Sequence, residues 1–398
     1  MDRFVDVLFL ILKIMTAYIG VVGFLFFLPR KRFATAAPKT RFAVLLPCRN
    51  EENVIVNIIE SIRAQNYPQE LYDIIVIPNN CTDDTAGVAA RAGARIFACE
   101  GKIRGKGDVL HQVFKALMGQ YDAYCVFDAD NLLHPDFLAR MNDAVVGGAK
   151  IAKGRQKASN PYDSWMSGCY DIYMETSNTL HSRARQSLGL NAKLIGTGFM
   201  VTDALMQEMG GWNAFTITED TEFAAQCAYR NVRIHYVPEA IHYDEQPTTM
   251  GISLRQRRRW SGGVQIVANR YVPRLLTRCY RFRTLDFTIF VNMIYVQMLL
   301  LIPAVYEMIG LTGKELLLAF GSALLSFWAG SMALALLMCI TARRNLWRMM
   351  KSILTYPIYV ATWYPLHFIA LFVKPKKWTP IPHTGKARVD KEKSFGSP

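Results

Sequence analysis

The sequence lacks the patterns that mark several common classes of protein. Its eight cysteines are scattered, with no Cys-x-x-Cys pair and no histidine at zinc-ligand spacing, which excludes a zinc-ribbon or zinc-finger module. Reduced thiols packed as small apolar side chains in a cytosolic domain are the simplest interpretation. There is no internal repeat and no low-complexity tract, so neither a solenoid nor a compositionally biased chain is indicated.

Acidic residues are few relative to basic ones: 32 Asp and Glu stand against 46 Lys and Arg, a net charge of +14. Such an excess can indicate nucleic-acid binding. Here, however, the basic clusters flank apolar segments, at residues 30–32, 278–283, 343–344 and 374–377. This placement follows the positive-inside rule and suits contact with anionic lipid. We therefore predict a lipid bilayer, and not nucleic acid, as a partner.

Hydrophobic residues make up 51% of the chain and concentrate near its two ends. Residues 5–28 are long enough to cross a bilayer as a helix, although they include Lys13. A signal peptide has a shorter apolar region with basic residues before it, whereas here the basic cluster follows. We predict an uncleaved transmembrane helix in residues 1–33, with its amino end outside and the next domain in the cytoplasm, as in an integral protein of the plasma or inner membrane.

The carboxyl-terminal third contains three more apolar stretches. Residues 285–311 and 315–340 are predicted to span the membrane, while residues 353–373 are interrupted by Pro357 and Pro365 and either span or re-enter. Residues 284–373 are thus expected to form two or three membrane segments. The basic tail, residues 374–398, lies inside if the last segment re-enters, which is the interpretation we favour.

Residues 40–250 alternate strand-like and helix-like patterns. Buried strands are predicted at residues 42–48, 72–78, 94–99 and 121–128, with shorter ones at 150–153, 194–201 and 234–237. Helices are predicted between them, one of which has Thr82 as its N-cap. This alternation predicts an α/β domain with a mostly parallel, doubly wound sheet.

Two acids stand at the end of the predicted strand at residues 121–128. Asp128 and Asp130 are separated by one small residue, so the period of two along a strand points them the same way. The carboxyl edge of an open α/β sheet is where ligands bind. Two like charges side by side suit a hard divalent cation, which prefers oxygen ligands. A solvated turn explains a lone Asp-x-Asp equally well, and the other motifs decide between the two.

Three further segments carry reactive side chains. Gly105-Lys106-Gly107 opens a helix, and Thr218-Glu219-Asp220 has the form of a helix N-terminus; by themselves these would be a turn and a capping device. Residues 251–283 are predicted to form interfacial amphipathic helices, with Gln256 and Trp260 in the run Gln-Arg-Arg-Arg-Trp.

The ordered set formed by residues 47–51, 128–130, 218–220 and 256–260 resembles the membrane-bound family 2 glycosyltransferases. That group includes cellulose, chitin, hyaluronan and poly-N-acetylglucosamine synthases and, more distantly, ceramide glucosyltransferase. The resemblance covers about residues 42–263. It implies a Rossmann-like GT-A domain between transmembrane helices, Mg²⁺ or Mn²⁺ as cofactor, and a UDP-sugar donor.

The resemblance also implies roles for individual residues. Asp220 would be the general base, and Asp128 and Asp130 would hold the metal ion. The nucleotide-sugar would be bound by Pro47, Arg49, Glu51, Asn79, Lys106, Asp128, Gln256 and Arg259. The acceptor would be bound by Gly196, Thr197, Gly198, Phe199, Glu219 and Trp260.

One position departs from the family pattern. The second strand usually ends in an acid that contacts the base, and Asn79 stands there in this chain. An amide still accepts a hydrogen bond from uracil N–H but lacks the charge that strengthens it. The expected activity is inverting transfer of a sugar, N-acetylglucosamine or glucose, to a growing β-linked polysaccharide, with an export partner or a homo-oligomer. Single-sugar transfer to diacylglycerol, a ceramide-like lipid or polyprenyl phosphate is the alternative, and a non-catalytic membrane nucleotide sensor is a third.

Overall fold

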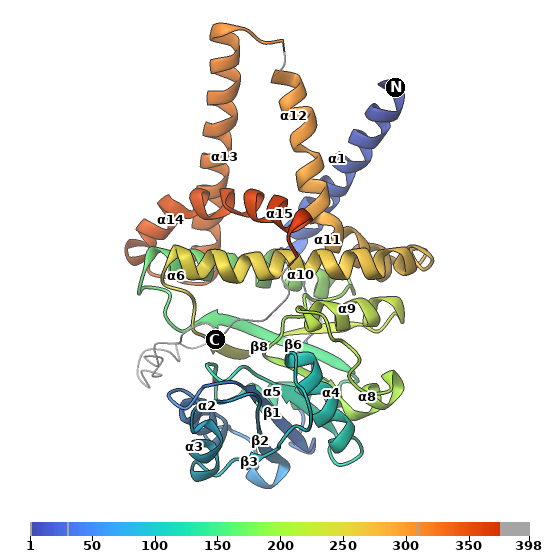
Figure 1. Cartoon of the computed structure of the whole chain (residues 1–398), viewed down its shortest axis with the longest axis vertical. Helices are drawn as coiled ribbons and strands as arrows, with labels where there is room; N and C mark the ends of the chain where they lie inside the picture. Colours follow the sequence, from blue (N-terminus) through green and yellow to red (C-terminus); the bar gives the residue numbers. More distant parts are fainter. Residues whose placement is uncertain (1, 30–31, 309, 375–398) are drawn as a thin grey trace.

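The computed structural model describes residues 2–29, 32–308 and 310–374. A globular α/β body occupies one end of the molecule, and α1, α12 and α13 project from the other (Figure 1). Between them lies a layer of helices that run crosswise to the projecting ones, α10, α14 and α15 among them.

The first half of the sheet is parallel, as the alternation of strands and helices predicts. Its order is β3-β2-β1-β4, and β1 pairs in parallel with both β2 and β4. These strands are β1 (Phe42–Cys48), β2 (Tyr72–Pro78), β3 (Arg95–Ile96) and β4 (Ala123–Val126). Every residue of β1 and β4 is buried. β3 is shorter than the predicted strand at residues 94–99.

The second half is mixed, and the whole sheet has eight strands in the order β3-β2-β1-β4-β7-β6-β8-β5. Here β7 (Phe199–Thr202) is antiparallel to β4 and to β6 (Ile151–Ala158), while β8 (Ile234–Asp244) is parallel to β6 and antiparallel to β5 (Leu132–Leu133). The prediction of a strand at residues 194–201 was wrong in its first half, because residues 194–198 form a loop. β8 extends well beyond the predicted residues 234–237.

Alternate residues of β1 face two separate cores, which is why the strand is apolar throughout. Phe42, Val44 and Leu46 pack with α2 (Ile55–Arg63) and α5 (Phe137–Val146). Ala43 and Leu45 face the other layer, which includes α4 (Lys106–Leu117), α8 (Asp203–Met209) and α9 (Glu219–Tyr229). The sheet is therefore covered on both faces, as expected for parallel strands.

The prediction that Thr82 caps a helix was wrong. α3 (Thr85–Arg91) begins three residues later, with Asp84 at the N-cap position. The backbone N–H of Thr82 instead donates to Asn50 Oδ1 at 2.8 Å. This bond joins the loops that follow β1 and β2, so it fixes the carboxyl edge of the sheet.

Several helices connect the body to the membrane-side layer. These are α6 (Trp165–Thr176), the π-helical turn η3 (Ser177–Arg183), α7 (Ala184–Ser187), α10 (Met250–Leu276), α11 (Phe282–Leu299), α14 (Leu346–Ala361) and α15 (Trp363–Phe372). A buried ion pair fixes α11 to the body, with Arg185 Nε 2.9 Å from Asp286 Oδ2. Tyr18 of α1 (Asp2–Phe24) donates to the same carboxylate at 3.0 Å.

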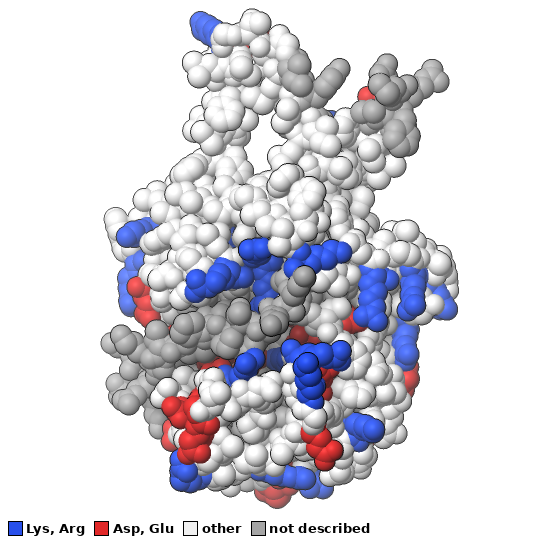
Figure 2. All heavy atoms as spheres, viewed as in Figure 1, with Lys and Arg blue, Asp and Glu red and all other residues white. Residues whose placement is uncertain are grey.

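Two helices in the described part of the chain are long and apolar enough to cross a membrane. They comprise Asp6–Phe27 and Gly313–Thr341 (α13), which match the predicted segments 5–28 and 315–340. A band of Lys and Arg crosses the molecule below the largely uncharged projecting helices (Figure 2). This is the charge pattern of a protein seated at a lipid surface.

The other two apolar stretches differ from the expectation. Residues 285–311 are not one spanning helix: α11 ends at Leu299, and a separate helix α12 (Leu301–Met308) follows. The amino-terminal half of α11 packs on the body, where Thr284 and Asp286 are buried and hydrogen-bonded. Residues 353–373 fall in α14 and α15, which lie crosswise to α12 and α13 (Figure 1). Of the tail, only residue 374 lies inside the described residues.

Candidate active site

A single large cavity, about 830 Å³ in volume, opens at the carboxyl edge of the sheet and extends below the membrane-side helices. Most of the residues predicted to bind donor, metal or acceptor line it. They are Pro47, Arg49, Glu51, Asn79, Lys106, Asp128, Asp130, Gly196, Thr197, Glu219, Asp220, Gln256, Arg259 and Trp260. Segments more than two hundred residues apart in the chain, from residue 47 to residue 260, thus meet at one place.

Two predicted acceptor residues do not line the cavity. Phe199 is 1% exposed and stacks on Trp212 in the core, with ring centroids 5.9 Å apart. Gly198 has φ +64°, and a side chain there would collide with the ring of His242. Gly198 therefore permits a turn against β8, and Phe199 is a packing residue, because β7 begins at that position.

Asp128 and Asp130 stand beside two further acids, Glu51 and Asp244. The pKa of Asp130 lies well above its usual value, because of burial and the charges of Asp244, Asp128 and Glu51. Burial and the charge of Asp128 raise the pKa of Glu51 to about 8 and that of Asp244 to about 6. So many carboxylates in one place favour a cation.

The described residues contain no complete set of three or more His, Cys, Asp or Glu side chains arranged to hold a metal ion. This cluster of carboxylates nevertheless fits a divalent cation, since hard cations bind carboxylate oxygens and complete their coordination with other oxygen ligands. Asp128 and Asp130 would supply the protein's share of those oxygens, while the partly buried Asp244 is held by Gln246 and by Asn131 at 2.8 and 2.9 Å.

Lys106 joins the metal-side acids to the acceptor-side loop. Its Nζ lies 2.5 Å from Asp128 Oδ1 and donates to the carbonyl of Gly196 at 2.7 Å. Burial lowers its pKa, but Asp128 and the nearby Glu219 and Asp220 outweigh burial and leave the pKa raised. Lys106 is therefore a fixed positive charge at the centre of the cavity.

Glu219 and Asp220 form the first turn of α9 on the opposite wall. A Cβ added at Gly196 would meet Glu219 Oε1 at 3.5 Å and Asp220 Oδ2 at 3.8 Å, so the glycine leaves both carboxylates open to the cavity. Burial and the charge of Asp220 raise the pKa of Glu219 to about 7. Burial also raises the pKa of Asp220, partly offset by hydrogen bonds from Thr221 and by the charges of Lys106 and Arg259.

The loop before α9 is held by an acid of the same helix. Glu222 is fully buried and accepts from the backbone N–H groups of Phe215 and Thr216, both at 2.7 Å. Arg270 and Tyr271 of α10 donate to its other oxygen. Glu222 is thus a structural acid, whereas Glu219 and Asp220 line the cavity. Thr218 occupies the N-cap position, as predicted, but makes no capping hydrogen bond.

Helix α10 places Gln256, Arg259 and Trp260 on the cavity wall. The indole of Trp260 lies nearly parallel to the ring of Tyr173, with centroids 6.5 Å apart, and edge-on to Tyr170. Stacked aromatic faces of this kind suit the apolar face of a sugar.

Asn79 directly follows the last residue of β2. Its Nδ2 donates to the carbonyl of Cys48 at 2.8 Å, which leaves Oδ1 as the acceptor on that side chain. A carboxylate in the same orientation would place two acceptors against each other. The substitution of Asn for the expected acid therefore has a local structural reason.

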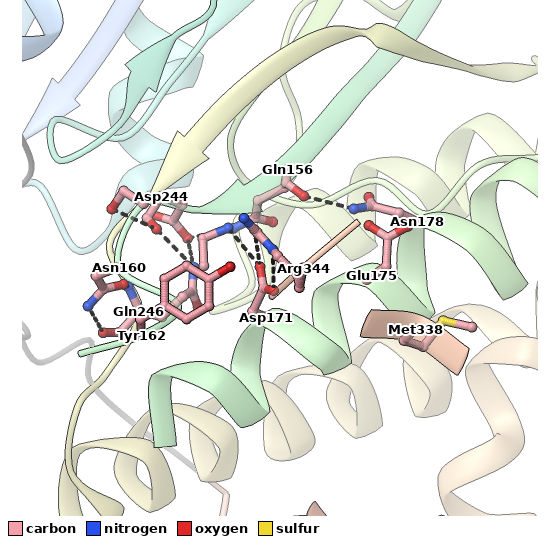
Figure 3. Close-up of polar contacts among 12 residues, drawn as sticks. Gln156, Asn160, Tyr162, Asp171, Glu175, Asn178, Asp244, Gln246, Met338 and Arg344 are labelled. Carbon is pink, nitrogen blue, oxygen red and sulfur yellow. Dashed lines mark hydrogen bonds and ion pairs between the residues drawn. The ribbon is translucent and has the colours of Figure 1, made fainter. Parts of the chain in front are cut away.

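The sequence-based prediction missed several cavity residues, of which Asp244, Gln156 and Lys153 matter most. Asp244 accepts from Gln156 and Gln246 at the end of β8 (Figure 3). Lys153 is buried and donates to the carbonyl of Thr197 at 2.9 Å. Predicting the full extents of β6 and β8 would have revealed these residues, because each strand carries its polar residues to the edge of the sheet.

A polar network connects this edge to the membrane-side helices. Arg344, which follows α13, pairs with Asp171 of α6 at 2.6 Å, and Arg155 of β6 pairs with Glu175 of α6 at 2.8 Å. Asn178 donates to the carbonyl of Gln156 at 2.7 Å (Figure 3). The cavity is therefore built on both the sheet and the membrane-side layer.

The family model described as "Glycosyltransferase like family 2" matches residues 38–263, more than half of the chain. The chain belongs to this glycosyltransferase family. The matched region holds all the predicted site residues and ends three residues after Trp260, within α10.

Curated relatives agree with this assignment. A probable glycosyltransferase, YdaM, of Bacillus subtilis is 26% identical over 58% of this chain and 57% of its own. A beta-monoglucosyldiacylglycerol synthase of Nostoc is 26% identical over 64% of this chain and 55% of its own. A poly-beta-1,6-N-acetyl-D-glucosamine synthase of Staphylococcus aureus is 24% identical over 65% and 63%. The chain thus spans less than two thirds of the length of these relatives.

Among solved structures, a mannosyltransferase from Pyrobaculum calidifontis, in complex with GDP-Man and Mn²⁺, aligns with a TM-score of 0.60 at 14% identity. The alignment covers 91% of this chain and 99% of that one. This likeness shows the GT-A fold, and it extends beyond the sheet into the membrane-side helices.

Proposed function

We propose that this family 2 glycosyltransferase moves a sugar from a nucleoside diphosphate sugar to an acceptor hydroxyl at a membrane surface. The observation that supports this best is the convergence of Asp128, Lys106, Asp220 and Arg259 on one cavity at the carboxyl edge of the sheet. Such an edge is the usual ligand site of an open α/β sheet.

A divalent cation, Mg²⁺ or Mn²⁺, would be held by Asp128 and Asp130. When bound, it supplies charge neutralisation to the leaving diphosphate. The raised pKa of Asp130 supports this role, because an added positive charge relieves the repulsion among the clustered acids. The Pyrobaculum mannosyltransferase carries Mn²⁺ with its donor. Lys106 and Arg259 would add positive charge to the same region.

The base would be Asp220, in partnership with Glu219. The acceptor oxygen attacks the anomeric carbon, the bond from that carbon to the diphosphate oxygen breaks, and the acceptor proton passes to the Asp220 carboxylate. One displacement of this kind inverts the anomeric centre, so an α-linked donor gives a β-linked product. Only one base is needed for such a displacement, and Asp220 lies beside Gly196 and near Lys106.

The donor is proposed to be a UDP-sugar carrying glucose or N-acetylglucosamine. Asn79, Pro47 and Arg49 lie where β1 and β2 end and would contact the base. Asn79 Oδ1 can accept the N–H of a uracil while Nδ2 stays bound to Cys48. The catalytic body would face the cytoplasm, where the basic band meets the anionic leaflet (Figure 2).

Two acceptor classes each have an observation in their favour. The aromatic pair Trp260 and Tyr173 favours a growing polysaccharide, because sugars stack on such faces. A lipid acceptor is favoured by the apolar wall that α11 and α15 give the same cavity. The relatives include an enzyme named for each product.

The test is a panel of radiolabelled UDP- and GDP-sugars presented to membranes containing the protein, with Mn²⁺ or Mg²⁺. We expect one UDP-sugar to be consumed and its label transferred, and EDTA to abolish transfer. Chromatography and gels then give the product length. Consumption of none of these donors by well-folded protein would contradict the proposal.

A further inference from the structure

One wall of the cavity is a stripe along α11 that runs away from the acids. Phe287, Phe290, Ile294 and Gln297 line it at three- and four-residue intervals, which places them on one helix face. Phe287 and Ile294 are buried, Phe290 is partly buried, and Gln297 at the far end is exposed. The stripe is about 15 Å long at the rise of an α-helix.

The facing wall comes from α15 and the end of α14. Val360, Trp363, Tyr364 and His367 line the cavity at the same helical spacing. The wall is held in place by α10, whose Ser261 hydroxyl lies 2.6 Å from His367 Nδ1. The outer face of α15 is apolar and exposed, as Phe368 and Phe372 show.

The two walls form a groove that leads from the reactive acids to the membrane side. Gln297 lies two residues before the end of α11, where α12 begins and projects alongside α1 and α13 (Figure 1). Exposed apolar side chains on Leu301 and Ile302 of α12 continue beyond it. The open end of the groove is thus continuous with apolar surface.

Polar atoms without a hydrogen-bond partner lie where the groove meets the reactive end. Thr218 Oγ1, Gln256 Oε1 and Asn191 Nδ2 are buried, and each residue lines the cavity. Buried polar atoms require partners, which a ligand with hydroxyl or ester groups can provide.

The charged residues at this junction favour some lipid head groups over others. The reactive end carries Glu51, Asp128, Asp130, Glu219, Asp220 and Asp244 against Arg49, Lys106, Lys153 and Arg259, an excess of acids. One divalent cation offsets the two negative charges of the donor diphosphate, which gains a further negative charge as it leaves. A neutral head with a hydroxyl group therefore suits the junction better than a phosphate.

We infer that the acceptor is a neutral, hydroxyl-bearing membrane lipid whose chains occupy the groove between α11 and α15. The inference rests on the proposed glycosyl transfer and names its acceptor class. The lipid hydroxyl oxygen bonds to the anomeric carbon as the nucleoside diphosphate leaves, and Asp220 takes the hydroxyl proton. The product is a lipid carrying a single sugar.

A growing polysaccharide suits the groove less well. The inner wall of the groove is apolar at Phe287, Phe290 and Ile294. A polymer that leaves through the membrane needs instead a path enclosed by several helices. The described residues contain two candidate spans, and both are largely exposed along their length. At its outer end the groove meets exposed apolar side chains instead.

The experiment uses the full chain in vesicles, the donor identified by the panel, and Met293→Trp, which adds bulk at a cavity-lining position of α11. Leu299→Trp is the matched control, because Leu299 lies on the same helix outside the cavity wall. Three acceptors are compared: vesicles with diacylglycerol, vesicles with polyprenyl phosphate, and soluble oligosaccharides with plain vesicles.

We expect a single-sugar product with diacylglycerol vesicles, reduced at least tenfold by Met293→Trp and little changed by Leu299→Trp. Donor binding and slow hydrolysis of the donor by water should persist in both variants. A polymer, a product with polyprenyl phosphate alone, or equal activity of the two variants would overturn the inference. Loss of donor binding and hydrolysis in the unmodified protein would instead contradict the proposed transferase function itself.

Discussion

Glu219 and Asp220 show how burial converts two ordinary acids into a coupled pair. Burial beside another carboxylate raises the pKa of Glu219 to about 7, while the positive charge of Lys106 attracts both carboxylates. A base with a pKa near the working pH is effective. The sequence indicated these residues, but only the structure shows that Gly196 leaves them uncovered.

This environment predicts the pH dependence of transfer. Glu219 and Asp220 titrate as a coupled pair whose pKa values are both raised, that of Glu219 to about 7, so protonation of the pair should lower activity as the pH drops below about 7. Glu219→Gln removes the member of the pair that titrates near 7, and should move the acid limb of the kcat profile to lower pH. Glu208→Gln, at a surface ion pair with Lys150, is the control. An acid limb that does not move would contradict the coupling.

At the scale of elements, the fold was predictable where strands were continuous apolar runs and less so where they were short or polar. β1, β2 and β4 could be predicted from the sequence because both faces of each strand are buried. β8 was predicted only to residue 237, because its later residues include Glu239, His242 and Asp244. Of these, His242 is fully buried against Phe137 of α5, a tertiary contact that no local pattern records.

α10 depends on a buried arginine that the motif did not single out. Arg257 is fully buried; it donates to Ser253 Oγ at 3.1 Å and to the carbonyl of Tyr359 at 3.0 Å, and it lies over the ring of Tyr359. It thus joins α10 to the end of α14. Gln256 and Trp260, its neighbours on α10, line the cavity.

We therefore predict that Arg257→Met disturbs positioning more than folding. The substitution removes a buried charge together with its hydrogen bonds to Ser253 and Tyr359, so it should cost about 1–3 kcal/mol of stability. The rate constant kcat should nevertheless fall about tenfold, with KM for the donor nearly unchanged, because Gln256 and Trp260 shift. Arg258→Met is the control, since Arg258 is exposed. Equal kcat values for the two variants, with thermal unfolding to confirm folding, would contradict this role.

At the scale of the whole molecule, the catalytic body and the membrane-side helices form one structure. The buried pair Arg185–Asp286 and the pair Asp171–Arg344 connect the two parts. Sequence patterns located the apolar segments but could not show that α11, α14 and α15 serve as cavity walls. That role depends on packing against α10. A helix with one apolar and one mixed face has the same sequence pattern whether it spans a membrane or lies across it.

The most direct test of the account compares Asp220→Asn and Asp130→Asn in vesicles, with Glu208→Gln as control. Sugar transfer and Mn²⁺-dependent binding of the donor are measured on the same samples. Asp220→Asn should abolish transfer by at least a hundredfold while sparing donor binding, whereas Asp130→Asn should weaken both. Full activity in both variants would show that these acids do not form one site, and would contradict the account.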